Sequence, residues 1–131
     1  MEFRLRNERQ GVEKDELEFV KVSIVIGNIV KVIVDRPLGT YHPKHKNIYY
    51  SVNYGHIQGI IAPDGEEQDA YILGVSEPVE EFTGKVIAII HRFDDVEEKW
   101  VVAPEEISFT RDEIMRQVAF QEQYFQTEIR M

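Results

Sequence analysis

Short runs of valine, isoleucine and aromatic residues follow one another closely along most of this chain. The runs occupy residues 21–34, 48–61, 70–75, 85–93 and 99–104. β-branched and aromatic residues in runs of this length, bounded by turn-forming residues, are typical of β-strands. Because several short strands succeed one another before any helical pattern begins, the sequence predicts a small antiparallel barrel.

Glycines within the first two runs indicate turns. Gly27-Asn28 lies within residues 21–34 and predicts a two-residue hairpin between two strands. Within residues 48–61 the pattern favours short extended pieces around a turn at Tyr54-Gly55. The acidic segment 94–98 separates the last two runs and predicts another hairpin loop.

One clear helical pattern comes last. Thr110 precedes it as an N-cap, and Glu113 follows at the capping-box spacing. The apolar face that would pack on the barrel consists of Ile114, Val118, Phe120, Tyr124 and Phe125. The predicted fold is therefore mostly β with a C-terminal helix.

Size and charge limit the classes of function. The chain has 131 residues, and we predict an N-terminal arm over 1–20 and a single domain over 21–131. It has no cysteine and no signal-peptide pattern, which fits the cytoplasm. No apolar run approaches the roughly 20 residues that cross a bilayer, so no membrane partner is expected. The net charge of −9 argues against nucleic acid, but leaves open a small anion held through metal ions.

Two acidic segments precede predicted strands. Residues 64–69 read D-G-E-E-Q-D, and residues 94–98 read D-D-V-E-E. In an antiparallel meander both segments lie at the same end of the sheet, because the strand between them runs back. One rim would then hold up to eight carboxylates: Asp64, Glu66, Glu67, Asp69, Asp94, Asp95, Glu97 and Glu98.

Carboxylates gathered in this way repel one another, at roughly 1 kcal/mol per pair at 4 Å in water. Bound cations would offset the repulsion, and oxygen donors alone favour Mg²⁺, Mn²⁺ or Ca²⁺. Lys99, Tyr50 and Tyr54 lie close by in the sequence and are side chains that can hold a phosphate. From the residues alone, the alternatives are two solvated acidic turns, core tyrosines and a surface ion pair of the lysine.

The segments YYSVNYGHIQGIIAPDGEEQD and HRFDDVEEKWVVAP, at residues 49–69 and 91–104, resemble the soluble family I inorganic pyrophosphatases. The similarity extends over roughly residues 22 to 125. It implies an OB-like five-stranded antiparallel barrel. It also implies Mg²⁺-dependent hydrolysis of a small anionic diphosphate, pyrophosphate, to two phosphates by metal-activated water. Mn²⁺ is the alternative metal, and a homo-oligomer is a further expectation.

The resemblance also implies roles for individual residues. The metal ligands would be Asp64, Asp69, Asp94 and Glu97. Glu66 stands where the family has the aspartate that helps to activate the water. Lys99 and Tyr54 would act on the substrate in catalysis, and the substrate-binding residues would be Tyr50, Tyr54, Lys99 and Tyr124.

The sequence departs from the family pattern at several positions. Glu66-Glu67 replaces an Asp-Pro, and Glu97 replaces an aspartate. Phe125 stands where the family has a lysine, and Ile33 where it has an acidic residue. The candidates for the family's arginine are Arg36, Lys44 and Lys46. The alternative functions are therefore a hydrolase of another diphosphate, a non-catalytic phosphate-binding, metal-binding or interaction domain, and an unrelated acidic barrel.

Overall fold

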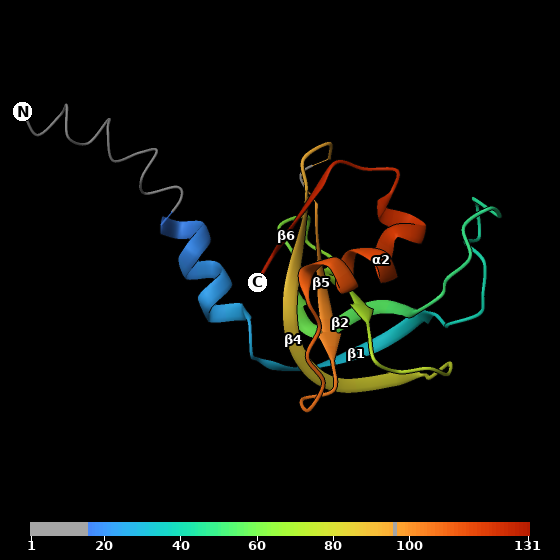
Figure 1. Cartoon of the computed structure of the whole chain (residues 1–131), viewed down its shortest axis with the longest axis horizontal. Coiled ribbons are helices and arrows are strands. Elements are labelled where there is room, and N and C mark those ends of the chain that lie inside the picture. The colour runs from blue at the N-terminus through green and yellow to red at the C-terminus, as the bar shows by residue number, and fades with distance from the viewer. Residues whose placement is uncertain (1–15, 96) are drawn as a thin grey trace, which may run out of the picture.

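A computed structural model describes residues 16–95 and 97–131. Its regular elements, shown in Figure 1, are β1 (Ile29–Arg36), β2 (Asn53–Ile61), β3 (Glu67–Ile72), β4 (Glu81–Arg92), β5 (Glu98–Ala103), α2 (Arg111–Glu122) and β6 (Thr127–Arg130). Residues 16–25 are also helical. No helix in these two ranges is long and apolar enough to cross a membrane.

Five strands close into a barrel. The sheet order is β1-β2-β3-β5-β4-β6, and β1 also pairs with β4, which joins the two sides. β6 extends the sheet beyond β4. The predicted mostly β fold with a C-terminal helix and an OB-like five-stranded barrel is confirmed. The barrel is mixed rather than wholly antiparallel, because β3 and β5 pair in parallel.

This parallel pair brings the two acidic turns together. Ala70 is in register with Trp100, so β3 and β5 start at the same end of the barrel. Each acidic turn directly precedes one of these strands. The predicted meeting of the turns is therefore present, although β3 and β4 are not the direct neighbours that a simple meander would make them.

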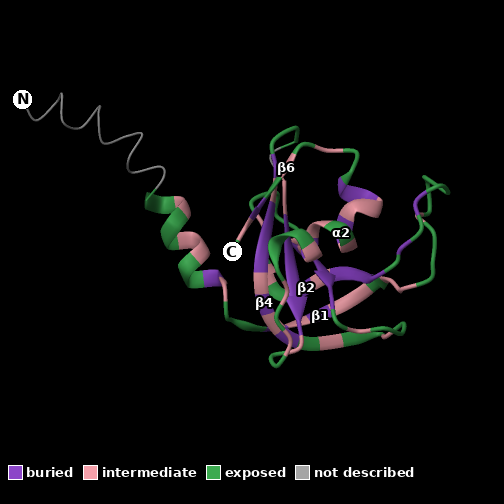
Figure 2. Cartoon of the chain, in the orientation of Figure 1, coloured by how far each residue is buried: buried purple, intermediate pink, exposed green. Residues whose placement is uncertain are grey.

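The core has two layers, which β3 and β5 separate. Alternate side chains of a strand point to opposite faces. Ala70 and Ile72 join one buried cluster, whereas Tyr71 and Leu73 join a second cluster that includes residues of α2. Figure 2 shows that these central strands are buried while the surrounding loops are exposed. Burial on both faces explains the uninterrupted apolar run at 70–73.

Helix α2 begins as predicted and ends earlier. The hydroxyl of Thr110 accepts a hydrogen bond from the Glu113 N–H, and the Glu113 carboxylate accepts one from the Thr110 N–H. Ile114 and Val118 are fully buried against the barrel. Because the helix ends at Glu122, Tyr124 and Phe125 lie in the segment between α2 and β6.

The hairpin predicted at Gly27-Asn28 is wrong, because the segment before the turn is a helix and only the segment after it is a strand. Residues 16–25 are helical, and in Figure 1 this segment projects from the barrel on the side away from α2. Val22, Val25 and Ile26 pack against the barrel at helical spacing. Gly27, at φ 96°, makes the turn into β1. Of the predicted arm over 1–20, residues 1–15 lie outside the described residues.

The predicted turn at Tyr54-Gly55 is also wrong, because β2 runs straight through it. Gly55 instead allows β1 to approach closely: a Cβ there would lie 1.9 Å from the Ile33 carbonyl oxygen. The side chain of Asn53 is buried and accepts hydrogen bonds from the Leu38 and Val79 N–H groups. Asn53 and Gly55 therefore hold β2 in place against neighbouring segments, and Tyr54 lies between them in the chain.

Candidate functional site

Two cavities of opposite charge adjoin at the end of the barrel where β3 and β5 begin. The acidic cavity, of about 620 Å³, is lined by carboxylates from both acidic turns and the strands after them: Asp64, Glu66, Glu67, Asp69, Glu97 and Glu98. The basic pocket, of about 480 Å³, lies beside α2 and is lined by Arg36, Arg92 and Lys99 among others. Asp69 and Lys99 belong to the walls of both.

Asp94 and Asp95, the other two carboxylates predicted at this rim, have structural roles in the second acidic turn. Asp94 accepts a hydrogen bond of 2.6 Å from the Gln126 N–H. Asp95 accepts one from the Glu97 N–H and lies 3.5 Å from Arg92. Neither residue lines the acidic cavity, so a role of Asp94 as a metal ligand stays a prediction.

Asp69, Lys99 and Tyr54 form the junction between the cavities. The Lys99 Nζ lies 2.6 Å from Asp69 Oδ2 and 3.3 Å from Glu97 Oε2. The hydroxyl of Tyr54 donates a hydrogen bond of 2.9 Å to the same oxygen of Asp69. Burial and the charge of Asp69 raise the pKa of Tyr54 well above its usual value. Tyr54 therefore remains a neutral hydrogen-bond donor.

The carboxylates suit a divalent cation in kind, because hard oxygen donors are what Mg²⁺ and Mn²⁺ prefer. Within residues 16–95 and 97–131, however, no three His, Asp or Glu side chains converge closely enough to hold one ion. Asp69 and Glu97 instead face Lys99, and Glu97 also lies 3.2 Å from Arg92. A cation binding at these carboxylates would compete with protein cations already beside them.

The acidic cavity also receives groups from the helical segment and from β2. Lys21 pairs with Glu98, and Glu18 lies 2.6 Å from Arg130. On the β2 side, His56 lies 2.8 Å from Asp35 and 3.4 Å from Glu67. The hydrogen bond to Asp35 raises the pKa of His56, although partial burial opposes the increase.

Of the three candidates for the family's arginine, Arg36 lines the basic pocket. Its guanidinium donates to the hydroxyl of Tyr50 and lies 5.5 Å from the centre of that ring and 5.7 Å from the Tyr54 ring. Tyr50 is fully buried and lines neither cavity, so it supports Arg36 from behind. Lys44 and Lys46 lie in the exposed loop before β2.

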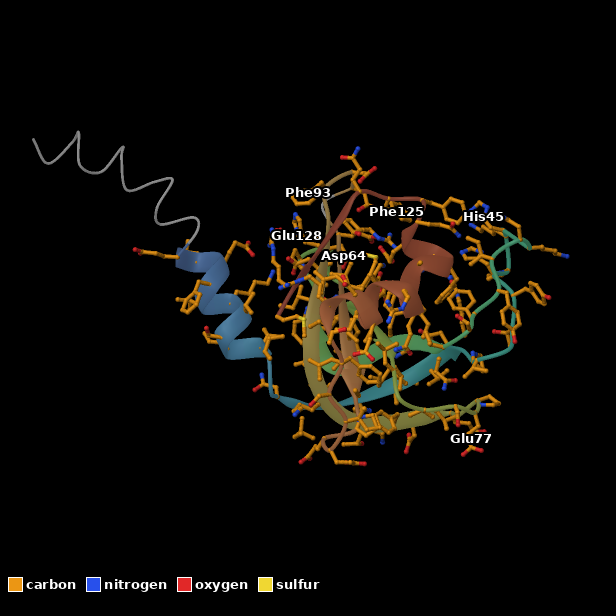
Figure 3. The ribbon with its side chains drawn as sticks, viewed as in Figure 1. His45, Asp64, Glu77, Phe93, Phe125 and Glu128 are labelled. Atoms are coloured by element: carbon orange, nitrogen blue, oxygen red, sulfur yellow. The ribbon has the colours of Figure 1, made fainter. Side chains whose placement is uncertain are left out.

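Two further pocket residues follow α2. Tyr124 is half exposed, and its hydroxyl accepts a hydrogen bond of 3.3 Å from the Asn47 side chain. Phe125 also lines the pocket. Figure 3 labels Phe125, in the segment after α2, and His45, in the loop before β2, and both residues line the basic pocket.

Sequence reasoning missed Arg92 and Glu122. Arg92 donates to both Glu122 carboxylate oxygens, at 2.9 and 2.7 Å, and its guanidinium lies 3.7 Å from the centre of the Phe125 ring. Burial lowers the pKa of Arg92, but the hydrogen bonds and charge of Glu122 outweigh this, and the pKa is raised. The alternation of side chains along the strand could have indicated the burial of Arg92. Ala88, Ile90 and Arg92 occupy alternate positions on the buried face of β4 that packs towards α2.

Solved structures of inorganic pyrophosphatases share this fold. The enzyme of Ehrlichia chaffeensis aligns with a TM-score of 0.60 at 18% identity, covering 79% of this chain and 85% of that one. The Neisseria gonorrhoeae enzyme gives 0.59 at 19%, covering 75% and 74%, and the Helicobacter pylori enzyme 0.54 at 12%, covering 79% and 82%. The chain therefore has a pyrophosphatase-like fold. No protein-family model and no curated protein matches the sequence.

Proposed function

We propose that this protein hydrolyses inorganic pyrophosphate to two phosphates with the help of a divalent cation, Mg²⁺ or Mn²⁺. The observation that carries the proposal is the contact between an acidic cavity and a basic pocket at Asp69 and Lys99. A metal-assisted phosphoryl transfer needs both environments side by side, one for the cation and one for the anion. The pyrophosphatase-like fold supports this reading.

The acidic cavity is where a cation would bind. Asp64, Asp69 and Glu97 line it and would supply the oxygen ligands after Lys99 is displaced from the carboxylates. When bound, the ion would lower the pKa of a water molecule and offset the charge of the phosphate oxygens.

Side chains of the protein would bind the substrate and accept a proton from the attacking water. Arg36, Lys99 and the Tyr54 and Tyr124 hydroxyls line the basic pocket and would bind the phosphate oxygens. Glu66 lines the acidic cavity and would accept a proton from the attacking water. The oxygen of that water forms a new bond to one phosphorus while the bridging P–O bond breaks, and the bridging oxygen leaves on the other phosphate.

One observation favours a second function, in which the domain binds a phosphate compound without turnover. The carboxylates expected to hold the cation face Arg92 and Lys99 instead. Glu66 and Glu97 also reach one methylene further than aspartates would, and displacement of a catalytic group by ~1 Å can cost about 10²-fold in rate. A binding domain would keep the basic pocket and lack measurable hydrolysis.

A comparison of matched carboxylate variants tests the proposal. Asp69→Asn should reduce phosphate release from pyrophosphate by about 10²-fold or more, with the circular dichroism spectrum unchanged. Glu106→Gln removes an exposed carboxylate in the turn after β5, at the other end of the barrel, and should leave the rate unchanged. Equal rates in both variants would rule out the assigned site.

A further inference from the structure

The ladder between β2 and β3 is interrupted beside the acidic cavity. His56 pairs with Asp69 on one side of the interruption. Ile61 pairs with Glu67 on the other side, so four residues of β2 lie opposite one residue of β3. An interruption of this kind leaves backbone groups without ladder partners. It would loosen the turn at 62–66, which joins the two strands and carries two of the carboxylates that line the cavity.

The Glu67 side chain bridges the interruption. One oxygen of its carboxylate accepts a hydrogen bond of 2.7 Å from the N–H of Gly59, a residue inside the interruption. The other oxygen lies 3.4 Å from the Nε2 atom of His56, where the ladder resumes. The side chain thus takes the place of ladder hydrogen bonds that the two strands do not make at this point.

His56 is held through its other ring nitrogen by Asp35. The Nδ1 atom of His56 lies 2.8 Å from Asp35 Oδ2. Asp35 is the extra residue where the pairing of β1 with β2 shifts, and such bulges redirect a side chain. Because carboxylates only accept hydrogen bonds, an imidazole between two of them is suited to donate from both nitrogens. Residues of β1, β2 and β3 therefore form one connected support.

These contacts account for the glutamate at position 67, where the pyrophosphatase family has a proline. A proline stiffens the chain through its fixed φ. Glu67 has a different means of doing so, because its carboxylate is held by a backbone N–H and by an imidazole. A carboxylate with these two partners is also less free to bind a cation than one that faces only the cavity.

The support and the turn together suggest a role for both side chains. We propose that Glu67 and His56 are positioning residues, which hold the 62–66 turn against β2 so that Asp64 and Glu66 lie at the acidic cavity before a cation arrives. Glu67 is then not itself a cation ligand. The inference rests on the proposed function only for the role of the cavity, because the support of the turn does not depend on any bound ion.

Amide hydrogen exchange of the full chain in excess EDTA, measured by nuclear magnetic resonance, tests the support without a metal. The Ala62 and Gly65 amides are hydrogen-bonded within the turn. Glu67→Ala should speed their exchange by about threefold or more, because a charge-assisted hydrogen bond is lost. The Val101 amide, in the buried strand β5, should keep its rate, because the effect is local. A smaller increase in the turn, or an equal one at Val101, would overturn the inference.

Further variants identify the contacts that hold the turn. Glu67→Gln retains an oxygen that can accept from the Gly59 N–H, so it should restore part of the protection that Glu67→Ala loses. His56→Phe removes the second partner and should also speed exchange in the turn. Glu106→Ala, an exposed change in the turn after β5, should have no effect. Exchange in His56→Phe as slow as in Glu106→Ala would contradict the role of the imidazole.

Binding of Mn²⁺, followed by electron paramagnetic resonance, distinguishes a positioning residue from a ligand. Glu67→Gln should weaken binding less than Asp64→Asn does, by about threefold against about tenfold, because only Asp64 would contact the ion. A loss in Glu67→Gln that equals or exceeds the loss in Asp64→Asn would overturn the positioning role. Absence of Mn²⁺ binding in the unmodified protein would instead reject the proposed function, and the exchange rates in EDTA would then decide the role of Glu67.

Discussion

Lys99 and Asp69 form a 2.6 Å ion pair at the junction of the acidic cavity and the basic pocket. The Lys99 side chain is only 6% exposed, so the pair is shielded from solvent on the lysine side. From this position Lys99 would be able to contact an anion in the basic pocket, and its charge would oppose any cation that approaches Asp69. The two cavities are therefore coupled through one ammonium group.

Removing that ammonium should have opposite effects on the two cavities. Lys99→Met frees Asp69 and Glu97, so Mn²⁺ binding, followed by electron paramagnetic resonance, should tighten by about tenfold. Phosphate release from pyrophosphate should fall at the same time. Lys85→Met, whose amine contacts the Glu105 carbonyl at the other end of the barrel, is the matched control. Unchanged or weaker Mn²⁺ binding in Lys99→Met would show that the lysine does not block the carboxylates.

The buried pair of Arg92 and Glu122 makes a prediction about stability. Glu122→Gln keeps the shape of the side chain but leaves a buried guanidinium without its bidentate carboxylate, and should cost about 3 kcal/mol of unfolding free energy. The double variant Arg92→Met/Glu122→Gln removes the uncompensated charge and should recover most of that loss. Urea denaturation measures both. A double variant that is less stable than Glu122→Gln alone would mean that the charge itself stabilises the fold.

The pair of His56 with Asp35 predicts a pH dependence. The pKa of His56 is raised in the folded state by its hydrogen bond to Asp35. Its stabilising contribution should therefore be fully present below the usual value of 6.5 and be lost as the pH rises through the higher folded-state pKa. A nuclear magnetic resonance titration should place the His56 midpoint above 6.5, and Asp35→Asn should lower it. A midpoint at or below 6.5 in the unmodified protein would contradict this account.

The sequence predicted the parts of the fold that depend on local patterns. The capping box of α2 could be predicted because it depends only on Thr110 and Glu113. The acidic hairpin loop could be predicted because it depends only on the two strands that flank it. That both acidic turns lie at the same end of the barrel was also predictable, because it follows from the directions of the strands. The parallel pairing of β3 with β5 was not, since it depends on how the barrel closes.

Other features depend on contacts between distant segments. The run K-V-S-I-V at 21–25 has the composition of a strand, yet it is helical, and Val25 packs against the barrel from there. Gly55 suggests a turn in the sequence, but the structure shows that a glycine is needed there because the backbone of β1 packs closely against it. The ion pair between Arg92 and Glu122 joins residues 30 positions apart, so no short sequence motif indicates it. Of the residues predicted for the site, Asp69, Lys99 and Tyr54 are in contact with one another, whereas Asp94 and Tyr50 lie outside both cavities.

Phosphate release from pyrophosphate by the purified full chain is the most direct test of the proposed function. We predict turnover in Mg²⁺ or Mn²⁺ that stops in excess EDTA and that Asp69→Asn lowers by about 10²-fold. No release from pyrophosphate with either metal, in protein that still binds methylenediphosphonate, which cannot be hydrolysed, would contradict the enzyme and identify the domain as a diphosphate-binding protein.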